Sequence, residues 1–382
     1  MKITKLFKEF FESEKAAGLI LIVCTIISLL LTNSSLQNQY QGLWHLSIFN
    51  ESLQHWINDG LMAIFFLLIG LELEREVYIG ELSSLKNAML PVVAALGGML
   101  IPAGFYLLFN YQTTTSSGAG IPMATDIAFA LGVLSLLGNR IPLSLKIFLT
   151  ALAVIDDLGA IFVIAIFYTK TLVWTNLITS LSIFAFLLVL NRIKVRNLIP
   201  YLVGGIFMWY YMLHSGIHAA ITGVLLAFAI PFGKGDTKST SYILQHFLHK
   251  PVAFLILPLF ALANTAIVIH SGWQFTFNEP FAKGILCGLI MGKPVGIILF
   301  SLLSVYLGIC ELPKNLNWKH ISGAGFLAGI GFTMSIFITL LAFDKNELIN
   351  SSKLMILIAS FISAILGFVL LRIVTRRGLE KN

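Results

Sequence analysis

Residues 151–167 have the sequence ALAVIDDLGAIFVIAIF, an apolar run of helical length that contains two adjacent aspartates, Asp156 and Asp157. A helix that crosses a membrane needs about 20 predominantly apolar residues, and the apolar segment around this run extends over residues 145–168. An ionised side chain at the bilayer centre costs about 2.5 to 3.5 kcal/mol on insertion scales, so such residues are functional candidates. The run therefore predicts a transmembrane helix with two functional carboxylates.

The rest of the 382-residue chain is similarly apolar, with 57% hydrophobic residues, 11% charged residues and a mean hydropathy of +0.89. Charged residues make up about a quarter of a soluble chain, so the composition excludes an ordinary soluble globular protein. The apolar runs predict twelve transmembrane segments, at roughly residues 16–32, 56–73, 88–109, 121–138, 145–168, 173–191, 198–212, 216–231, 251–270, 284–308, 321–342 and 353–373. We therefore expect an all-α integral membrane protein, a single polytopic domain over residues 1–382 whose surface is covered by lipid.

The basic residues indicate how these segments are oriented. If the N-terminus is cytoplasmic, most of the 25 Lys and Arg residues fall on that side. The opposite side then holds only Lys170, Lys283, Lys345 and Lys353. Cytoplasmic loops carry an excess of Lys and Arg, so an even number of spans with both termini in the cytoplasm is favoured. The net charge of +7 does not indicate nucleic-acid binding, because the basic residues are scattered between hydrophobic runs.

Two connections between the predicted spans have distinctive sequences. Residues 33–52 contain no Lys or Arg and include the strand-like run LWHLSIF at 43–49. A small periplasmic β-hairpin and a disordered polar loop are alternative interpretations of this connection. Residues 231–240, PFGKGDTKST, are rich in Gly, Ser, Thr and charge, which predicts a cytoplasmic linker.

Four ionisable side chains lie inside predicted spans: Asp126, Asp156, Asp157 and Lys293. One interpretation is that they form internal salt bridges that only hold helices together. Lys293 can neutralise a single carboxylate, however, so the remaining acids need protons, a bound cation or water. A buried carboxylate can exchange a proton for a small hard cation, with hydroxyl oxygens such as that of Thr125 as further ligands. The charges therefore indicate a proton and cation pathway, and it is electrogenic if two aspartates release two protons for one monovalent cation.

Glycines interrupt two of the predicted spans. The stretch GAGIP at 118–122 precedes Asp126, and four glycines punctuate residues 323–331. Such paired spans point to discontinuous helices around a site at the membrane midplane, whereas close helix packing is the alternative role of the glycines. The N-termini of half-helices are partly positive and their C-termini partly negative. Asp126 is suited to the positive ends, and Lys293 to the negative ends.

The second predicted span ends in residues 70–82, GLELEREVYIGEL, where a polar cluster is expected to meet the cytoplasm: Glu72, Glu74, Arg75, Glu76 and Glu81. Glu72 and Glu76 share a helix face through their four-residue spacing. A solvated helix end is one interpretation, and an acidic funnel that attracts cations and responds to pH is the other. His246 and His249 could join such a sensor, because an unperturbed imidazole titrates near about pH 6.5.

Four motifs together resemble the NhaA-type bacterial sodium/proton antiporters over essentially the full length of the chain. They are ATDIAFALG at 124–132, LAVIDDLGAI at 152–161, MGKPVGI at 291–297 and GIGFTMSIFI at 329–338. The resemblance implies about twelve transmembrane helices, with inverted repeats in segments three to five and ten to twelve. It also implies that segments four and eleven are discontinuous helices that cross. A secondary transporter rather than an enzyme is therefore expected.

The same resemblance implies roles for the buried charges. Asp156 and Asp157 would carry protons and transiently bind Na+ or Li+, and Lys293 would pair with Asp156. Asp126 and Thr125 would belong to the crossed-helix site. The implied activity is extrusion of sodium from the cytoplasm in exchange for external protons, by alternating access and without a cofactor.

A pH-sensing mouth on the cytoplasmic side is also implied by the resemblance. Its members would be Glu72, Arg75, Glu76, Gln245, His246, His249 and His218. Asp59 would lie near the periplasmic end of segment two. At Gln245, in LQHFLHK (244–250), the chain departs from the best-known members, which carry a glutamate there. Because a neutral amide cannot titrate or repel Glu72 and Glu76, we expect an altered pH threshold.

The family likeness further implies a bacterial inner-membrane protein that supports pH homeostasis and salt tolerance. It implies a homodimer assisted by the periplasmic hairpin. Two other functions use buried acids. A proton-coupled symporter for a small organic solute predicts a larger pocket with aromatic or hydrogen-bonding ligands. An intramembrane aspartyl protease is the weaker alternative, because the Tyr-Asp context of such proteases is missing.

Overall fold

The structure is a computed structural model that describes residues 5–169, 171–233, 235–236, 238–269, 272–313 and 315–379. The described residues are mostly helical and contain only one short β-hairpin, which confirms the all-α prediction. They form two compact units. Unit 1 comprises Met1–Tyr40, Ser84–Ala160 and Asn264–Asn382, and unit 2 comprises Gln41–Ser83 and Ile161–Ala263.

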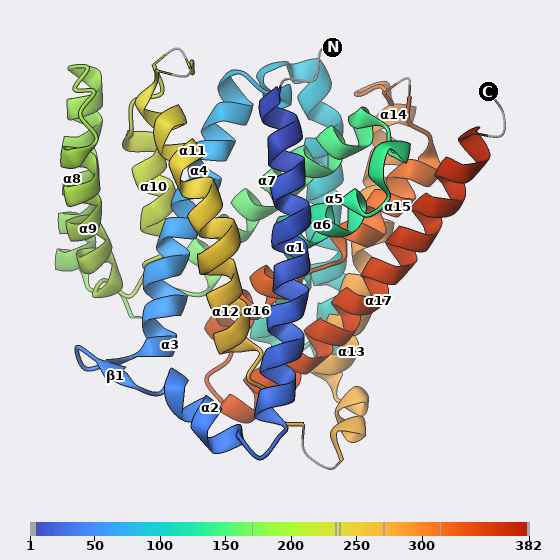
Figure 1. The fold of residues 1–382 in the computed structure, drawn as a ribbon, viewed down its shortest axis with the longest axis horizontal. Helices are drawn as coiled ribbons and strands as arrows, with labels where there is room; N and C mark the ends of the chain where they lie inside the picture. Colours follow the sequence, from blue (N-terminus) through green and yellow to red (C-terminus); the bar gives the residue numbers. More distant parts are fainter. Residues whose placement is uncertain are drawn as a thin grey trace. The chain divides into compact units, whose positions relative to one another are not determined.

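Unit 1 is built from helices of both ends of the chain. Its elements are α1 (Lys5–Thr32), α5 (Leu85–Asn110), the 3-10 helix η3 (Ser116–Met123), α6 (Ile127–Ser135), η4 (Gly138–Arg140), most of α7 (Leu143–Phe167), η6 (Trp273–Asn278), α13 (Pro280–Cys287), the π-helical turn η7 (Gly288–Gly292), α14 (Lys293–Tyr306), α15 (Trp318–Ala328), α16 (Phe332–Ala342) and α17 (Asn346–Leu379). Figure 1 shows that α1 begins and α17 ends at the same end of this unit.

Unit 2 contains the remaining helices and a short hairpin. Its elements are β1 (Ser47–Ile48), β2 (Glu51–Ser52), α3 (Leu53–His55), the π-helical η1 (Trp56–Leu61), α4 (Met62–Tyr78), η2 (Glu81–Ser83), α8 (Trp174–Arg192), α9 (Ile199–Leu213), α10 (Ile221–Ala229), α11 (Thr240–Pro251), η5 (Val252–Ile256) and most of α12 (Leu257–Asn264). The short helix α2 (Gln37–Trp44) crosses from unit 1 into unit 2.

Membrane-spanning helices account for most of the described chain. Nine helices in the described ranges are long and apolar enough to cross a membrane, and α15 with α16 forms a further span bent by 47°. The expected segments 198–212 and 216–231 correspond to the shorter helices α9 and α10. The second of these begins later than predicted because Gly216 has a φ of 88°, which turns the chain before α10 starts.

One predicted span was displaced along the chain. The segment expected at 251–270 is a continuous helical stretch over Thr240–Asn264, and residues 265–269 are not helical. Pro251 lies inside this stretch, and the π-helical turn η5 follows it directly. A proline interior to a helix removes a backbone donor, and the wider turn accommodates that loss. Hydropathy alone did not reveal this continuation, because Gln245, His246, His249 and Lys250 interrupt the apolar run.

The predicted connections contain ordered local structure. In the hairpin, Ser47 pairs with Ser52 and Ile48 with Glu51, and the turn residues Phe49 and Asn50 both have positive φ. Positive φ at both central residues is typical of a two-residue hairpin turn. Leu43 and Trp44 are helical rather than extended. In the stretch 231–240, Lys234 and Thr237 lie outside the described residues.

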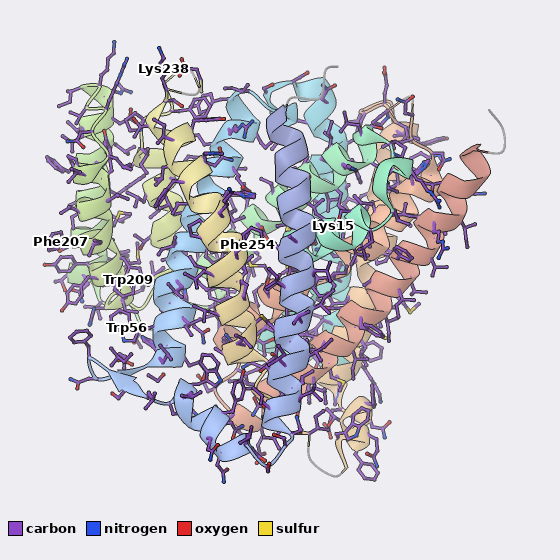
Figure 2. The ribbon with its side chains drawn as sticks, viewed as in Figure 1. Lys15, Trp56, Phe207, Trp209, Lys238 and Phe254 are labelled. Carbon is purple, nitrogen blue, oxygen red and sulfur yellow. The ribbon has the colours of Figure 1, made fainter. Side chains whose placement is uncertain are left out.

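The outer surface of each unit is apolar. Leu108 of α5 is 78% exposed in unit 1, and Phe207 of α9 is 56% exposed in unit 2. Figure 2 shows Phe207 pointing outward from its helix. Large exposed apolar surfaces of this kind are not stable in water, so lipid chains must cover them.

Glycine contacts hold α5 against α14 in unit 1. A Cβ atom added at Gly97 would lie 2.6 Å from Phe300 Cβ and would also clash with the carbonyl oxygen of Gly296. Gly104 is on the same helix, and a Cβ atom there would meet nothing within 4 Å. Small residues allow helix backbones to approach closely where lipid provides no hydrophobic driving force between helices.

We therefore expect Gly97→Ala to destabilise the protein and Gly104→Ala not to do so. Overpacking of a close interface costs about 1–3 kcal/mol. The measurement is thermal unfolding of the purified protein in detergent, in which the fraction of protein that stays monodisperse is recorded at each temperature. Equal midpoint temperatures for the two variants would contradict this assignment of the α5–α14 contact.

Candidate functional site

Two helix breaks meet inside unit 1. The first lies at residues 124–126, between η3 and α6, and the second at 329–331, between α15 and α16. The backbone amide of Asp126 donates a hydrogen bond to the carbonyl oxygen of Ile330 over 2.7 Å. Both predicted interruptions are therefore present, and each break supplies a backbone partner that the other lacks.

Asp126 binds the N-terminal ends of both half-helices that follow the breaks. Its Oδ1 accepts a hydrogen bond from the amide of Phe129 at 2.9 Å, so Asp126 is the N-cap of α6. Its Oδ2 accepts hydrogen bonds from the amide and the hydroxyl of Thr333 in α16, at 3.0 and 2.6 Å. The side chain is 2% exposed. The expectation that Asp126 compensates positive helix ends is confirmed.

Lys293 serves the opposite ends. Its ammonium group donates to the carbonyl oxygen of Met123, the last residue of η3, and lies 2.8 Å from Asp156 Oδ2. The hydroxyl of Thr125 lies 2.7 Å from the same carboxylate oxygen and 2.9 Å from the carbonyl oxygen of Ala328, where α15 ends. The ammonium group of Lys293 therefore contacts the C-terminal end of η3, as expected, and the hydroxyl of Thr125 contacts the C-terminal end of α15.

Asp156 and Asp157 occupy one turn of α7 and are both fully buried, as is Lys293. Asp156 Oδ1 has no hydrogen-bond partner among the described residues. Successive side chains on a helix diverge by about 100°, so Asp157 leaves α7 in a different direction from Asp156. In its described part, unit 1 thus buries three carboxylates and two ammonium groups, those of Lys293 and Lys353. A small monovalent cation or protons can balance the remaining negative charge.

Thr333 and Lys353 were not predicted as members of the buried polar set. The FTMS sequence after the second break was the available signal for Thr333, but its partner, Asp126, is 207 residues away. Lys353 was expected in an outer connection, yet it is 4% exposed because α17 begins at Asn346, before the predicted start. Its ammonium group lies 3.4 Å from Asn264 Oδ1.

The predicted pH-sensing residues divide into two places in unit 2. Glu72, Arg75 and Glu76 are half-buried near the end of α4. The guanidinium of Arg75 lies 5.9 Å from the ring centre of Tyr242 in α11, and this ring stacks on His246 at 6.3 Å. Tyr242 thus connects the acidic cluster to a predicted histidine, and the sequence had not indicated it.

Gln245 and His249 lie on the same helix, α11, and both are half-buried. Glu74, which was expected to meet the cytoplasm with its neighbours, is only 5% exposed. That expectation was wrong because Glu74 leaves α4 about 200° away from Glu72, on the face of Gly70, which packs on α10.

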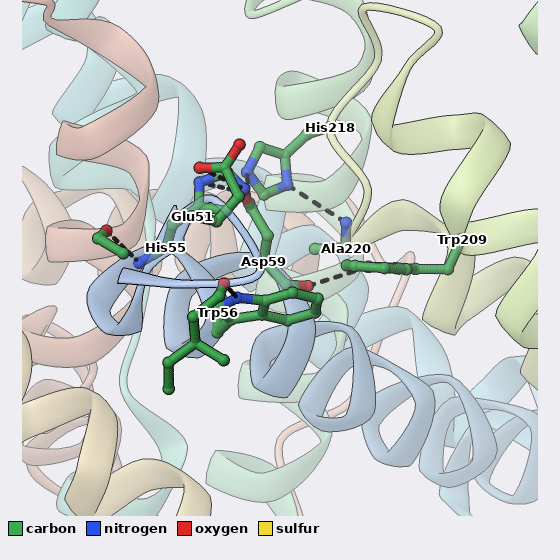
Figure 3. Close-up of polar contacts among 9 residues, drawn as sticks. Glu51, His55, Trp56, Asp59, Trp209, His218 and Ala220 are labelled. Atoms are coloured by element: carbon green, nitrogen blue, oxygen red, sulfur yellow. Dashed lines mark hydrogen bonds and ion pairs between the residues drawn. The ribbon is translucent and has the colours of Figure 1, made fainter. Parts of the chain in front are cut away.

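Asp59 joins two histidines at the other end of α4 (Figure 3). Its Oδ1 lies 2.9 Å from His218 Nε2 and its Oδ2 lies 3.1 Å from His55 Nδ1. The amide of Ala220 donates to His218 Nδ1, so Nε2 carries the proton that His218 donates to Asp59. His218 is therefore separated from Glu72, since the thirteen residues between Asp59 and Glu72 correspond to about 20 Å along a helix.

Aromatic contacts fix the Asp59 region. The indole nitrogen of Trp209 donates to the carbonyl oxygen of Asp59 over 3.2 Å, and Trp209 stacks on Trp56 at 6.0 Å. Figure 2 shows the two tryptophans near each other in unit 2. In the described part of the chain, no group of three or more His, Cys, Asp or Glu side chains could hold a metal ion.

The chain is similar to known proteins over almost its whole length. Residues 8–371 match the family described as Na+/H+ antiporter 1. The chain is 68% identical to the Na(+)/H(+) antiporter NhaA of Flavobacterium psychrophilum over 382 residues, which is 100% of each chain.

More distant relatives are also similar over their whole lengths. The Na(+)/H(+) antiporter NhaA of Cytophaga hutchinsonii is 58% identical over 382 residues, 100% of this chain and 99% of the relative. The Na(+)/H(+) antiporter NhaA 1 of Clostridium beijerinckii is 44% identical over 392 residues, 100% of this chain and 98% of the relative.

The contact between Asp126 and Thr333 predicts a specific loss of stability. Thr333→Val keeps the shape of the side chain but removes the hydroxyl donor, which should lower the free energy of unfolding by about 1–3 kcal/mol. Thr333→Ser keeps the donor and serves as the control. Thermal unfolding in detergent measures both, and a valine variant as stable as the serine variant would argue against the bridge.

Proposed function

Because the chain belongs to the Na+/H+ antiporter 1 family, we propose that Asp156 and Asp157 bind sodium and protons in turn, so that sodium leaves the cytoplasm as external protons enter. The protein is a multi-pass membrane transporter, not an enzyme, and it exchanges sodium ions for protons. The observation that carries the carrier assignment is the unbalanced burial of three carboxylates with the ammonium groups of Lys293 and Lys353.

Competition at one carboxylate explains the coupling. Asp156 Oδ2 is engaged by Lys293 and Thr125, while Oδ1 has no hydrogen-bond partner among the described residues. A sodium ion that binds Asp156 through Oδ1 can take oxygen ligands from carboxylate, hydroxyl and carbonyl groups. When the carboxylate is protonated, its charge is lost and the cation leaves. Sodium and proton then exclude each other without any further device.

The proposed exchange is electrogenic. If Asp156 and Asp157 each release a proton when one sodium ion binds, one net charge crosses the membrane in each cycle. The membrane potential then contributes about 2.3 kcal/mol per 100 mV to sodium extrusion. A reversal potential that corresponds to electroneutral exchange would contradict this stoichiometry.

Asp126 and Thr125 hold the two helix breaks together and position the carriers for alternating access. Asp126 is already bound by donors from both half-helices, so its part is structural rather than that of a carrier. Lys293 is the partner of Asp156 when the carboxylate is ionised and no sodium is bound, which is the state between release of its proton and binding of the cation.

We assign pH regulation to the residues at the cytoplasmic end of α4. Glu72 and Glu76 lie on one face, and Arg75, Tyr242 and His246 form a stack beside them. Charge changes in these groups would alter the contact between α4 and α11. His55, Asp59 and His218 would form the periplasmic part of the proton path.

The family likeness supports several wider proposals. Lithium is a second substrate, since it is also a small hard monovalent cation. The protein lies in the bacterial inner membrane with both termini cytoplasmic, and the likeness suggests a homodimer that uses the β1–β2 hairpin. Its roles would be salt tolerance and pH homeostasis. Light scattering of the purified protein with and without residues 45–54 tests the dimer.

Asp157→Asn should abolish exchange. In everted vesicles with a preformed proton gradient, sodium or lithium should collapse the gradient of the wild-type protein, more strongly as the pH rises from about 6.5 to about 8.5. The asparagine variant should give no collapse at any pH, because an amide neither titrates nor carries charge.

The control for this experiment is Glu347→Gln, which removes an exposed carboxylate in the first turn of α17. It should transport as the wild type does. Cation-dependent collapse in a folded Asp157→Asn protein would remove Asp157 from the carrier role.

Gln245→Glu should move the activation threshold to higher pH. Because α11 packs against α4, an added carboxylate on α11 would favour the protonated state of Glu72 and Glu76. Exposed pairs of charges interact by about 0.2–1 kcal/mol, which corresponds to roughly 0.2–0.7 pH units. Gln245→Lys should shift the threshold in the opposite direction. Coincident pH profiles for all three proteins would show that α11 does not participate in regulation.

A further inference from the structure

A cavity of about 460 Å³ lies in unit 2, and all of its lining residues belong to that unit. Its walls come from the end of α4, the end of α8 and the segment at the end of α10. The lining residues are Glu74, Tyr78, Ile79, Asn191, Phe228, Phe232 and Gly233. A volume of this size is within the range of small-molecule sites in proteins.

Glu74 is the charged group of this cavity. Its side chain is 5% exposed, and Oε2 accepts no hydrogen bond from any described residue. None of the lining residues in the part of the chain that the structure describes is basic. An ionised carboxylate that is buried without a partner costs several kcal/mol, so a proton or a cation must neutralise Glu74. The cavity has room for a group much larger than a proton.

Aromatic rings form much of the rest of the wall. Tyr78 and Phe232 stack with their centres 5.0 Å apart, and Phe228 also lines the cavity. The side-chain amide nitrogen of Asn191 donates to the backbone carbonyl oxygen of Ala229 over 3.1 Å. This hydrogen bond fixes the side chain of Asn191 in the wall. Aromatic faces attract cations through their quadrupole and also provide apolar contact area.

The cavity is distinct from the acidic cluster that we assign to pH regulation. Glu72 and Glu76 are about 40° apart around α4, whereas Glu74 is about 200° from Glu72. Arg75, the nearest basic residue along the helix, lies over the ring of Tyr242 in α11. A ligand that binds Glu74 would therefore not occupy the face formed by Glu72 and Glu76.

We propose that this cavity binds an organic ammonium ion with an aromatic or aliphatic body, whose charged group pairs with Glu74 and whose apolar part packs on Phe228 and the Tyr78–Phe232 stack. A bare sodium ion fits the cavity poorly, because a single carboxylate and aromatic walls do not provide the several oxygen ligands that a hard cation takes. An anion is repelled by Glu74. This assignment is independent of the proposed transport cycle.

Two sources can supply an ammonium group of this kind. One is a soluble organic amine, and the other is the headgroup of an aminophospholipid such as phosphatidylethanolamine. Tyr78 is 65% exposed and Phe228 is 40% exposed, so the aromatic wall is accessible from outside unit 2. The chemistry at Glu74 is the same in both cases.

The test uses the full-length protein in a non-ionic detergent and isothermal titration with 2-phenylethylammonium. The neutral isostere 2-phenylethanol is titrated in parallel. Hydrogen bonds to charged groups contribute about 1.5–3 kcal/mol, so the ammonium probe should bind at least about ten-fold more tightly than the alcohol. Equal affinity of the two probes, or no binding of the ammonium probe, would overturn the proposal without any variant.

Substitutions locate the site. Glu74→Gln keeps the shape of the side chain and should weaken the ammonium probe at least about ten-fold while leaving the alcohol unchanged. Phe228→Ala should weaken both probes. Glu347→Gln removes a distant exposed carboxylate and should leave both affinities as in the wild type. An unchanged affinity of the ammonium probe for Glu74→Gln would place its binding elsewhere and refute the assignment.

The same titration in lipid nanodiscs separates the two sources. Phosphatidylethanolamine nanodiscs that weaken binding of the probe, relative to phosphatidylglycerol nanodiscs, identify the lipid headgroup as the occupant. Equal affinities in both lipids identify a soluble amine. Either result supports an ammonium site at Glu74, provided that the glutamine variant loses it.

Discussion

The pairing of two helix breaks through Asp126 is the constraint on which the rest of unit 1 depends. Inside a membrane no water is present to satisfy free backbone groups, so a broken helix is stable only if protein atoms replace the missing hydrogen bonds. Asp126 supplies acceptors to the amides of Phe129 and Thr333, and its own amide reaches Ile330. Each break is therefore stable only in the presence of the other.

Lys293 and Thr125 contact the partly negative C-terminal ends of the half-helices that precede the breaks, where both donate to carbonyl oxygens. The same two side chains also contact Asp156, the proposed carrier.

Helix periodicity explains why acids only two residues apart have different surroundings. Glu72 and Glu76 lie on the α4 face close to that of Arg75, which contacts α11, whereas Glu74 lies on the face of Gly70, which packs against α10. A sequence such as GLELEREV is therefore not one acidic patch. Its carboxylates lie on the surface that we propose for pH regulation on one side, and in a cavity with aromatic walls on the other.

Hydropathy and motif patterns were sufficient to identify a helical membrane antiporter, both helix breaks and the four buried charges at Asp126, Asp156, Asp157 and Lys293. These features are local, because insertion into lipid depends on runs of about 20 residues and a buried charge is conspicuous within its own run. Only the tertiary structure showed that Thr333 is a partner of Asp126 and that Glu74 and Lys353 are buried. It also placed His218 beside Asp59 rather than in the predicted pH-sensing mouth. Such contacts join residues that are far apart in the chain, or depend on which helix face is covered, and packing between helices decides both.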